Sequence, residues 1–196
     1  MKLSRAERVT TSVLAAAAAI LERAGYAGLT MERVAAESGV AKTTLYRRWP
    51  TKAALCVDLY LDVAARELRD PGTGDVARDL KAIAQTVVSL QKRTVAGPAF
   101  VGLLAEAQIA PETRTEVLAG FARKRRELTR QVLQRAIARG QLRRGTDVDL
   151  VIDVIGGATT FRLLQGHAPL SKRFTDDLID LVLSGCQRPP RRKGRT

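Results

Sequence analysis

The sequence predicts an all-α protein, and three observations support this fold class. Alanine and leucine are abundant, whereas aromatic residues make up only 4% of the 196 residues. Both abundant residue types lose little conformational entropy when they enter a helix. Apolar residues recur at helical spacing along most of the chain, and no segment alternates apolar and polar residues as a half-buried strand does.

Capping residues and helix breakers divide the first seventy residues into four helices. Gly25 can end the first helix in the left-handed conformation, and Thr30 can cap the second. Gly39 breaks the second helix, Pro50 stops the third, and Thr51 caps the fourth. The predicted helices span residues 5–24, 30–37, 42–49 and 51–69.

Five further helices in the second half bring the total to about nine. Gly140 can close a long basic helix, Asp147 can cap an apolar one, and Ser171 opens the last. These helices span residues 75–93, 97–110, 112–139, 147–165 and 171–185. We expect an N-terminal three-helix domain at residues 1–52, a C-terminal helical domain at residues 53–186 and a basic, disordered tail at residues 187–196.

The formal net charge of +13 is concentrated in the first fifty residues, in residues 111–145 and in the last ten. A polyanionic partner is the natural interpretation, but charge alone does not distinguish DNA, RNA and a membrane surface. Two separated cysteines and a single histidine argue against a metal site, and we expect no cofactor. No segment has the ~18 apolar residues of a membrane span, and charges flanking the alanine run 15–19 argue against a secretion signal. We expect a cytoplasmic protein.

Residues 30–49 fit a helix-turn-helix. Ala35 falls where the first helix must lie close to the second, and Gly39 falls in the turn, where a positive φ favours glycine. Val34, Val40 and Leu45 supply the apolar contacts that fix the crossing angle of the two helices.

The polar side chains around this motif suit nucleic-acid binding. Lysine and arginine can reach guanine N7 and O6, and threonine can meet a thymine methyl group or a phosphate. A helix N-terminus with free amides, such as the one at Thr30, suits a phosphate. The alternative is a solvated basic helix face. The candidate DNA-binding residues are Thr30, Lys42, Thr43, Thr44, Tyr46, Arg47, Arg48 and Lys52.

Residues 8–60 closely resemble the N-terminal domain of the TetR family of bacterial transcriptional regulators. The resemblance is carried by the run 25–35, by 39–49 and by Pro50-Thr51-Lys52-Ala53-Ala54-Leu55; its most specific part is Thr44-Leu45-Tyr46, an aromatic residue three positions later, and then the lysine. It implies phosphate contacts from Thr44, Tyr46 and Lys52 and base contacts from Lys42, Thr43 and Arg47. Trp49 stands where the family usually has phenylalanine and is expected in the core. Thr43 replaces a small residue, often glycine, so the resemblance does not give the operator sequence.

Beyond residue 60 the resemblance is one of layout, and it implies a C-terminal half that dimerises and holds an effector. Gly156-Gly157-Ala158 would let another helix approach closely. Together with the face of the last helix that carries Phe174, Leu178, Leu181 and Val182, this helix could form a four-helix bundle across a two-fold axis. The homodimer is therefore expected to form through helices 147–165 and 171–185. The alternative is that both faces pack within one monomer.

An effector cavity is expected among the helices of residues 53–140, lined by apolar side chains. Each candidate lining residue has plain core packing as its alternative, and Cys56 is expected to be a buried thiol rather than a redox sensor. The candidates are Phe100, Leu104, Gln108 and Phe121.

The basic stretch 123–139 is expected to balance the acidic residues of 146–186 on a neighbouring helix, with an anionic-ligand site as the alternative. The basic tail is expected to add non-specific attraction to DNA phosphates.

These features predict a sequence-specific transcriptional regulator that binds a double-stranded DNA operator. We expect a repressor that a small-molecule effector releases from a palindromic site. An activator of the same family and a non-specific nucleic-acid-binding protein are the alternatives. An enzyme is not expected, because the chain has no GxSxG, P-loop, HExxH or dinucleotide-binding glycine pattern.

Overall fold

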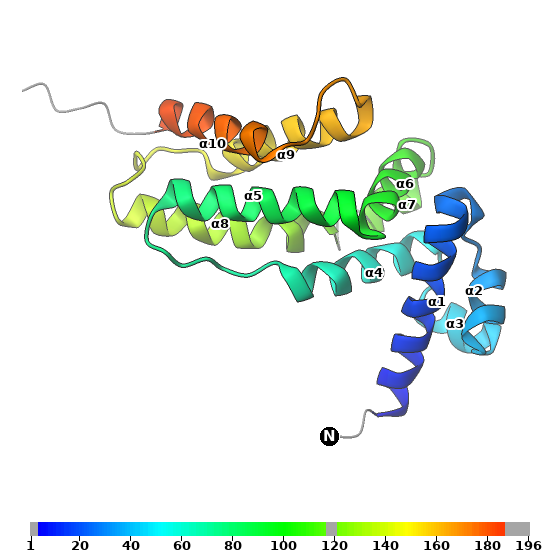
Figure 1. The fold of residues 1–196 in the computed structure, drawn as a ribbon. Coiled ribbons are helices and arrows are strands. Elements are labelled where there is room, and N and C mark those ends of the chain that lie inside the picture. The colour runs from blue at the N-terminus through cyan, green and yellow to red at the C-terminus, as the bar shows by residue number, and fades with distance from the viewer. Residues whose placement is uncertain (1–3, 117–120, 187–196) are drawn as a thin grey trace, which may run out of the picture. The chain divides into compact units, whose positions relative to one another are not determined.

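The computed structural model describes residues 4–116 and 121–186, which form ten α-helices and no β-strand (Figure 1). The helices are α1 (Arg5–Gly28), α2 (Met31–Ser38), α3 (Lys42–Arg48), α4 (Lys52–Glu67), α5 (Val76–Arg93), α6 (Ala96–Ile109), α7 (Pro111–Glu116), α8 (Arg123–Ala138), α9 (Val148–Gln165) and α10 (Lys172–Cys186). The predicted all-α fold class is confirmed. The predicted tail, residues 187–196, lies outside the described residues.

Two predicted helix boundaries need correction. Gly25 takes a positive φ of 64°, as its predicted capping role requires, but the helix resumes after this break and continues to Gly28. The single basic helix expected over residues 112–139 is replaced by the short α7 and the separate α8. Residues 117–120, between α7 and α8, lie outside the described residues.

Contacts divide the chain into two compact units, which are described separately. Unit 1 comprises Met1–Leu68 and Ser89–Lys124, and therefore contains α1 to α4, α6 and α7. Unit 2 comprises Arg69–Val88 and Arg125–Thr196, and contains most of α5 together with nearly all of α8 and the whole of α9 and α10.

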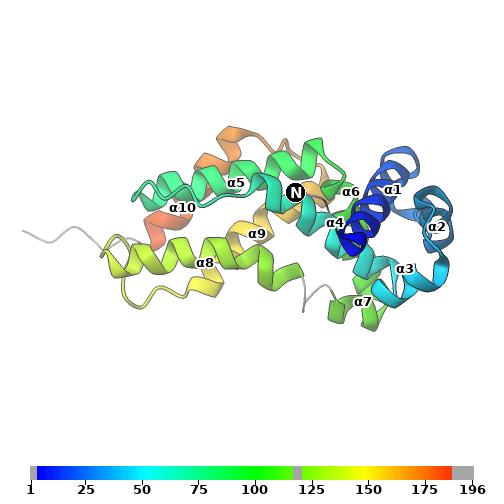
Figure 2. The ribbon, with the colours of Figure 1, turned by 90° about the horizontal axis from the view of Figure 1, so that it is seen from below.

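In unit 1, α1 packs against α2, α4 and α6, and α4 packs against α6 and α7. Val13, Ala17 and Ile20 of α1 are fully buried at the spacing that the sequence predicts for its apolar stripe. Trp49, directly after α3, is also buried, as expected. The first three helices lie together in both views (Figures 1 and 2).

In unit 2, α10 packs against α9. Side chains of α5 also reach α10: Lys81 pairs with Asp180 at 2.6 Å, and the Gln85 amide donates to Asp176 at 2.6 Å. Leu178 of α10 is buried, but Leu181 is 71% exposed. The apolar stripe predicted for this helix therefore lies only partly against the rest of unit 2.

Candidate nucleic-acid interface

The helix-turn-helix is formed by α2, the turn at Gly39 and α3, all in unit 1. The Thr30 hydroxyl accepts a hydrogen bond from the Arg33 amide at 3.2 Å and so caps α2, as predicted. Gly39 has a φ of 68°, a conformation that is unstrained only for glycine. Val34 and Leu45 are fully buried where the two helices meet. The predicted motif therefore has the caps, the turn and the packing that the sequence indicates.

α3 is basic and exposed, and it has no acidic residue of its own. Five of the predicted contact residues on α3 are exposed, and Thr44 is half-buried. The exposed ones are Lys42, Thr43, Tyr46, Arg47 and Arg48. Since α3 contains no acidic residue, nothing on the helix itself opposes the approach of a polyanion.

Tyr46 is 39% exposed, and its hydroxyl donates a hydrogen bond to Glu32 at 2.9 Å. This hydrogen bond raises the pKa of Tyr46 above the ordinary value of a tyrosine. The single phenolic proton is thus engaged with Glu32, so a hydrogen bond from this hydroxyl to a phosphate would replace the one to Glu32.

The long α1 is joined to the helix-turn-helix by a hydrogen bond and an ion pair. The Ser12 hydroxyl donates to the Ser38 carbonyl at 2.9 Å, and Arg23 pairs with Glu37 at 2.7 Å. After α3, the indole N–H of Trp49 donates to Asp58 of α4 at 2.9 Å. The helix-turn-helix is thus fixed to α1 on one side and to α4 on the other.

Lys52 lies at the first position of α4, next to the cap Thr51. Its ammonium lies 3.3 Å from Glu106 of α6 and 4.2 Å from the centre of the Tyr26 ring. The resemblance implies a phosphate contact for Lys52. In the structure, however, the same ammonium pairs with the Glu106 carboxylate.

Glu106 joins four helices through its carboxylate. Besides Lys52, it accepts hydrogen bonds from the Tyr26 hydroxyl at 3.0 Å and from the Thr113 hydroxyl at 2.8 Å. Desolvation opposes its ionisation, but the hydrogen bonds and Lys52 outweigh this and lower the pKa of Glu106 below the ordinary value. A Cβ at Gly102 would overlap the Tyr26 ring, so glycine is needed for this close approach.

The candidate effector residues do not share one environment. Phe100 and Phe121 are buried with Tyr60 in a three-ring cluster, in which the Tyr60 ring lies 4.4 Å from Phe121 and 6.1 Å from Phe100. Leu104 is half-buried. Gln108 is exposed, and its amide donates to the Leu104 carbonyl on its own helix at 3.2 Å. The structure therefore brings together the two phenylalanines, adds Tyr60 to them, and places Gln108 at the surface of unit 1.

Two family models match this chain. The model described as bacterial regulatory proteins, tetR family, matches residues 13–59, which include the whole helix-turn-helix. The model described as tetracyclin repressor-like, C-terminal domain, matches residues 70–182, more than half of the chain. The chain belongs to the TetR family.

Individual proteins agree with this assignment. The DNA-binding transcriptional repressor TetR of Mycobacteroides abscessus is 33% identical over 198 residues, which cover 95% of this chain and 98% of that protein. The HTH-type transcriptional regulator YdeS of Bacillus subtilis is 28% identical over 184 residues, 93% of this chain and 92% of its own. The crystal structure of the TetR family transcription regulator SCO0332 is 36% identical, with a TM-score of 0.80, and covers 92% of this chain and 100% of that one. The chain is thus a DNA-binding transcriptional regulator.

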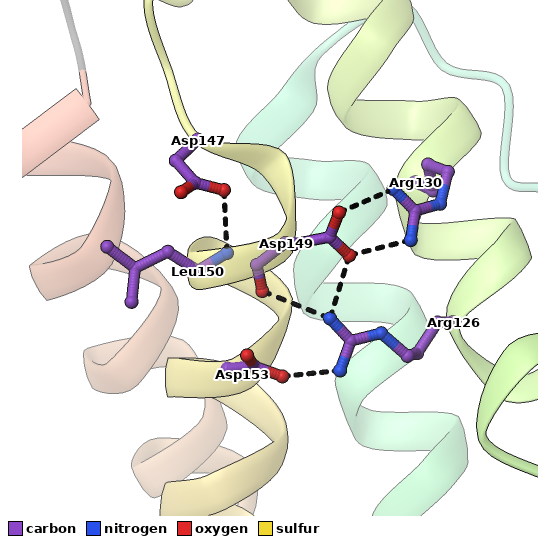
Figure 3. A network of polar contacts seen from close by, with 6 residues as sticks. All are labelled: Arg126, Arg130, Asp147, Asp149, Leu150 and Asp153. Atoms are coloured by element: carbon purple, nitrogen blue, oxygen red, sulfur yellow. Dashed lines mark hydrogen bonds and ion pairs between the residues drawn. The ribbon is translucent and has the colours of Figure 1, made fainter. Parts of the chain in front are cut away.

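Three arginines of the basic stretch of this TetR-family chain, Arg126, Arg130 and Arg135, form ion pairs within unit 2. Arg126 of α8 bonds to Asp149 at 2.8 Å and to Asp153 of α9, and Arg130 bonds to Asp149 at 2.6 Å (Figure 3). Arg135 pairs with Asp70 at 2.7 Å. The contacts of Arg126 and Arg130 with α9 are the charge balance expected for this stretch, whereas the partner of Arg135, Asp70, lies outside the expected residues 146–186. The two arginines lower the pKa of Asp149 well below the usual range of an aspartate.

Three further points concern the reactivity of Cys56, metal binding and membrane spans among the described residues. Burial raises the pKa of the Cys56 thiol to about 12, so this cysteine is a buried thiol that stays protonated at neutral pH. Within residues 4–116 and 121–186, no cluster of three or more histidine, cysteine or carboxylate side chains could hold a metal ion. No helix in the same ranges is long and apolar enough to cross a membrane.

Sequence reasoning missed Tyr26 and Glu106. Glu106 had a usable signal, because it is the only charged residue in the otherwise apolar α6. A lone carboxylate on an apolar helix needs a partner when it packs against neighbours. The partner, Lys52, lies 54 positions away in the sequence, so no local pattern identifies it.

Proposed function

We propose that this TetR-family chain works as a homodimeric repressor that places α3 of each protomer in a major groove of a palindromic operator. The observation that carries this proposal is the exposed, basic α3, which has no acidic residue of its own, on a helix-turn-helix fixed to α1 and α4. Lys42, Thr43 and Arg47 are assigned to base edges, and Thr30, Thr44, Tyr46 and Arg48 to phosphates. Such a regulator acts on the chromosome and therefore in the cytoplasm.

An apolar stripe on unit 2 supports the homodimer. Leu150, Val154, Phe161 and Leu164 of α9 are each at least 44% exposed and follow one another at helical spacing. Gly157 completes the stripe, and nothing lies within 4 Å of where its Cβ would be. A contiguous apolar stripe of this kind on a water-exposed helix marks an interaction surface.

A second copy of the chain is the proposed occupant of this stripe. Leu181 extends the apolar surface onto α10, the helix that packs against α9. Two such helix pairs would form a four-helix bundle about a two-fold axis, and Gly157 would let the α9 helices approach closely. A two-fold protein matches a palindromic operator.

The effector is proposed to bind in unit 1 beside the Tyr60–Phe100–Phe121 cluster, the largest group of buried rings among the described residues. Aromatic walls suit an apolar or planar small molecule. Proteins of similar fold include a flavonoid-responsive regulator and a regulator in complex with stearoyl-CoA, at 22% and 19% identity. That identity supports the fold alone, so the effector of this chain has to be found by experiment.

Selection of bound fragments from genomic DNA tests the proposed function. The purified protein should recover a palindromic site and bind it at least about a thousandfold more tightly than random duplex. A variant with Lys42, Thr43 and Arg47 changed to alanine should lose this specificity while keeping its helical circular dichroism spectrum. A matched variant of three exposed arginines elsewhere, Arg66, Arg93 and Arg144, should retain it.

Equal affinity of the wild type for selected and random duplexes would favour the alternative of a non-specific nucleic-acid-binding protein. In that case the salt dependence of both duplexes would be the same, because only phosphate contacts would remain.

A further inference from the structure

A basic groove lies beside the recognition helix, between the beginning of α1, the turn of the helix-turn-helix and α3. Its volume is about 880 Å³. The lining residues are Arg5, Ala6, Val9, Gly39, Val40, Ala41, Thr44, Arg47 and Arg48. All of them belong to unit 1, so the groove is formed within one compact unit.

The charges of the groove have one sign. Three arginines line it and no carboxylate does. Arg5 and Arg47 form no ion pair with any residue in the described part of the chain, in contrast to Arg23, which pairs with Glu37. Arg48 lies over the Trp49 ring, with its guanidinium carbon 5.0 Å from the ring centre. Such an arrangement of guanidiniums is suited to phosphate oxygens.

The position of Arg5 relative to α3 is held by contacts along α1. A capping box starts this helix: the Ser4 hydroxyl accepts from the Glu7 amide at 3.2 Å, and the Glu7 carboxylate accepts from the Ser4 amide at 2.7 Å. Glu7 is thus engaged with the backbone of the cap, outside the groove lining. One turn further on, Ser12 ties α1 to the end of α2. The start of α1 is therefore held beside the helix-turn-helix, and Arg5 lines the groove together with Arg47 and Arg48.

We infer that this groove holds the sugar-phosphate backbone of the operator beside the major groove occupied by α3, and that Arg5 of α1 is a phosphate-binding residue. This inference rests on the proposed function, because α3 must enter the major groove for the backbone to reach Arg5. An open groove continuous with α3 fits an extended phosphodiester strand, whereas a free phosphate or nucleotide would need groups that enclose it. The DNA contact surface then extends beyond the helix-turn-helix to the start of α1.

The test compares Arg5→Gln with wild type by fluorescence anisotropy on a selected operator and on a random duplex over a range of KCl concentrations. Loss of one phosphate contact should reduce the slope of log K against log salt by about 0.9 on both duplexes. Affinity should fall by roughly three- to tenfold at moderate salt, with the ratio between operator and random duplex unchanged. Glutamine keeps helix propensity, and thermal melts confirm that α1 stays folded.

Arg66→Gln is the matched control, because it removes the same charge from an exposed site at the end of α4, where Arg66 pairs only with Asp62 on its own helix. A slope for Arg5→Gln equal to that of Arg66→Gln would overturn the inference. Competition by inorganic phosphate at constant ionic strength, present in the wild type and lost in Arg5→Gln, would also overturn it in favour of a small-anion site. A wild type that prefers no sequence would refute the proposed function instead, while the slopes on random duplex would still report on Arg5.

Discussion

At the scale of single residues, Gln91 of α5 stands out because its side chain is buried and has no hydrogen-bond partner among the described residues. It is 4% exposed, and neither its amide nitrogen nor its amide oxygen has a partner in the described ranges. A buried polar group without a partner costs of order 1–3 kcal/mol relative to a paired one. The Gln85 amide on the same helix is satisfied by Asp176, so the two glutamines form a natural pair for comparison.

Replacing Gln91 by methionine should therefore stabilise the protein. The apolar side chain keeps the length of glutamine but removes the two unpaired atoms, and we expect the free energy of unfolding to rise by about 1–2 kcal/mol. Urea denaturation followed by circular dichroism measures this change. Gln85→Met, which breaks a hydrogen bond to Asp176, should lower the free energy of unfolding. Destabilisation by both variants would contradict the interpretation of Gln91.

At the scale of elements, the contact between Lys52 and Glu106 connects the start of α4 to α6. Both side chains are about a quarter exposed, and the two charged groups lie 3.3 Å apart. A DNA phosphate and Glu106 are alternative partners for the same ammonium. The carboxylate therefore opposes the phosphate contact that the family resemblance implies for Lys52.

Replacing Glu106 by glutamine should strengthen DNA binding. The amide removes the competing charge, so Lys52 becomes free to meet a phosphate, and the salt slope should rise by up to about 0.9. Anisotropy titrations on operator and random duplex measure both effects. Thr113→Val, which removes one hydrogen bond to the same carboxylate but keeps its charge, should change the slope little. The gain should vanish in a Lys52→Ala background; an equal gain there would show that Glu106 does not act through Lys52.

The ion pairs between α8 and α9 predict a pH dependence. Asp149 has a lowered pKa in the folded protein, so it binds a proton more readily when unfolded. Its stabilising contribution is complete above the unfolded-state pKa of about 3.9 and is lost as the pH falls below that value. The stability difference between wild type and Asp149→Asn should be constant from pH 5 to 8 and shrink below pH 4. Asp177→Asn, which removes only a 3.6 Å contact with Arg173 on its own helix, should show little difference at any pH.

Local signals predicted most elements of the helix-turn-helix. Thr30, Gly39 and Thr51 act through their own side chain or backbone conformation, so their roles follow from the sequence around them. The pairing of Lys52 with Glu106 and the clustering of Tyr60 with Phe100 depend on tertiary packing, which no local pattern specifies.

At the scale of the whole molecule, a palindromic operator requires two copies of the chain. Leu150, Val154, Phe161 and Leu164 of α9 and Leu181 of α10 leave apolar surface exposed on one chain, although the Phe161 ring lies 5.4 Å from the His167 ring. Isolated exposed apolar residues are common on proteins, but a contiguous stripe is not.

Replacing Phe161 by glutamate should therefore dissociate the dimer, because two carboxylates would be buried near the two-fold axis without partners. Sedimentation velocity should show the wild type as a dimer and the variant shifted towards monomer by at least tenfold in dissociation constant. Ile109→Glu is the control, since Ile109 is 85% exposed but lies on α6 in unit 1. A variant at Phe161 that remains as dimeric as the control would place the dimer interface elsewhere.

The most direct test of the central claim is methylation protection of guanine N7 on the selected operator. We expect two groups of protected guanines in the major groove, related by a two-fold axis and separated by about one helical turn or a multiple of it. Both groups should lose protection in the variant with Lys42, Thr43 and Arg47 changed to alanine. Protection that is unchanged in this variant, or that is confined to one group, would contradict the claim that two copies of α3 read the operator.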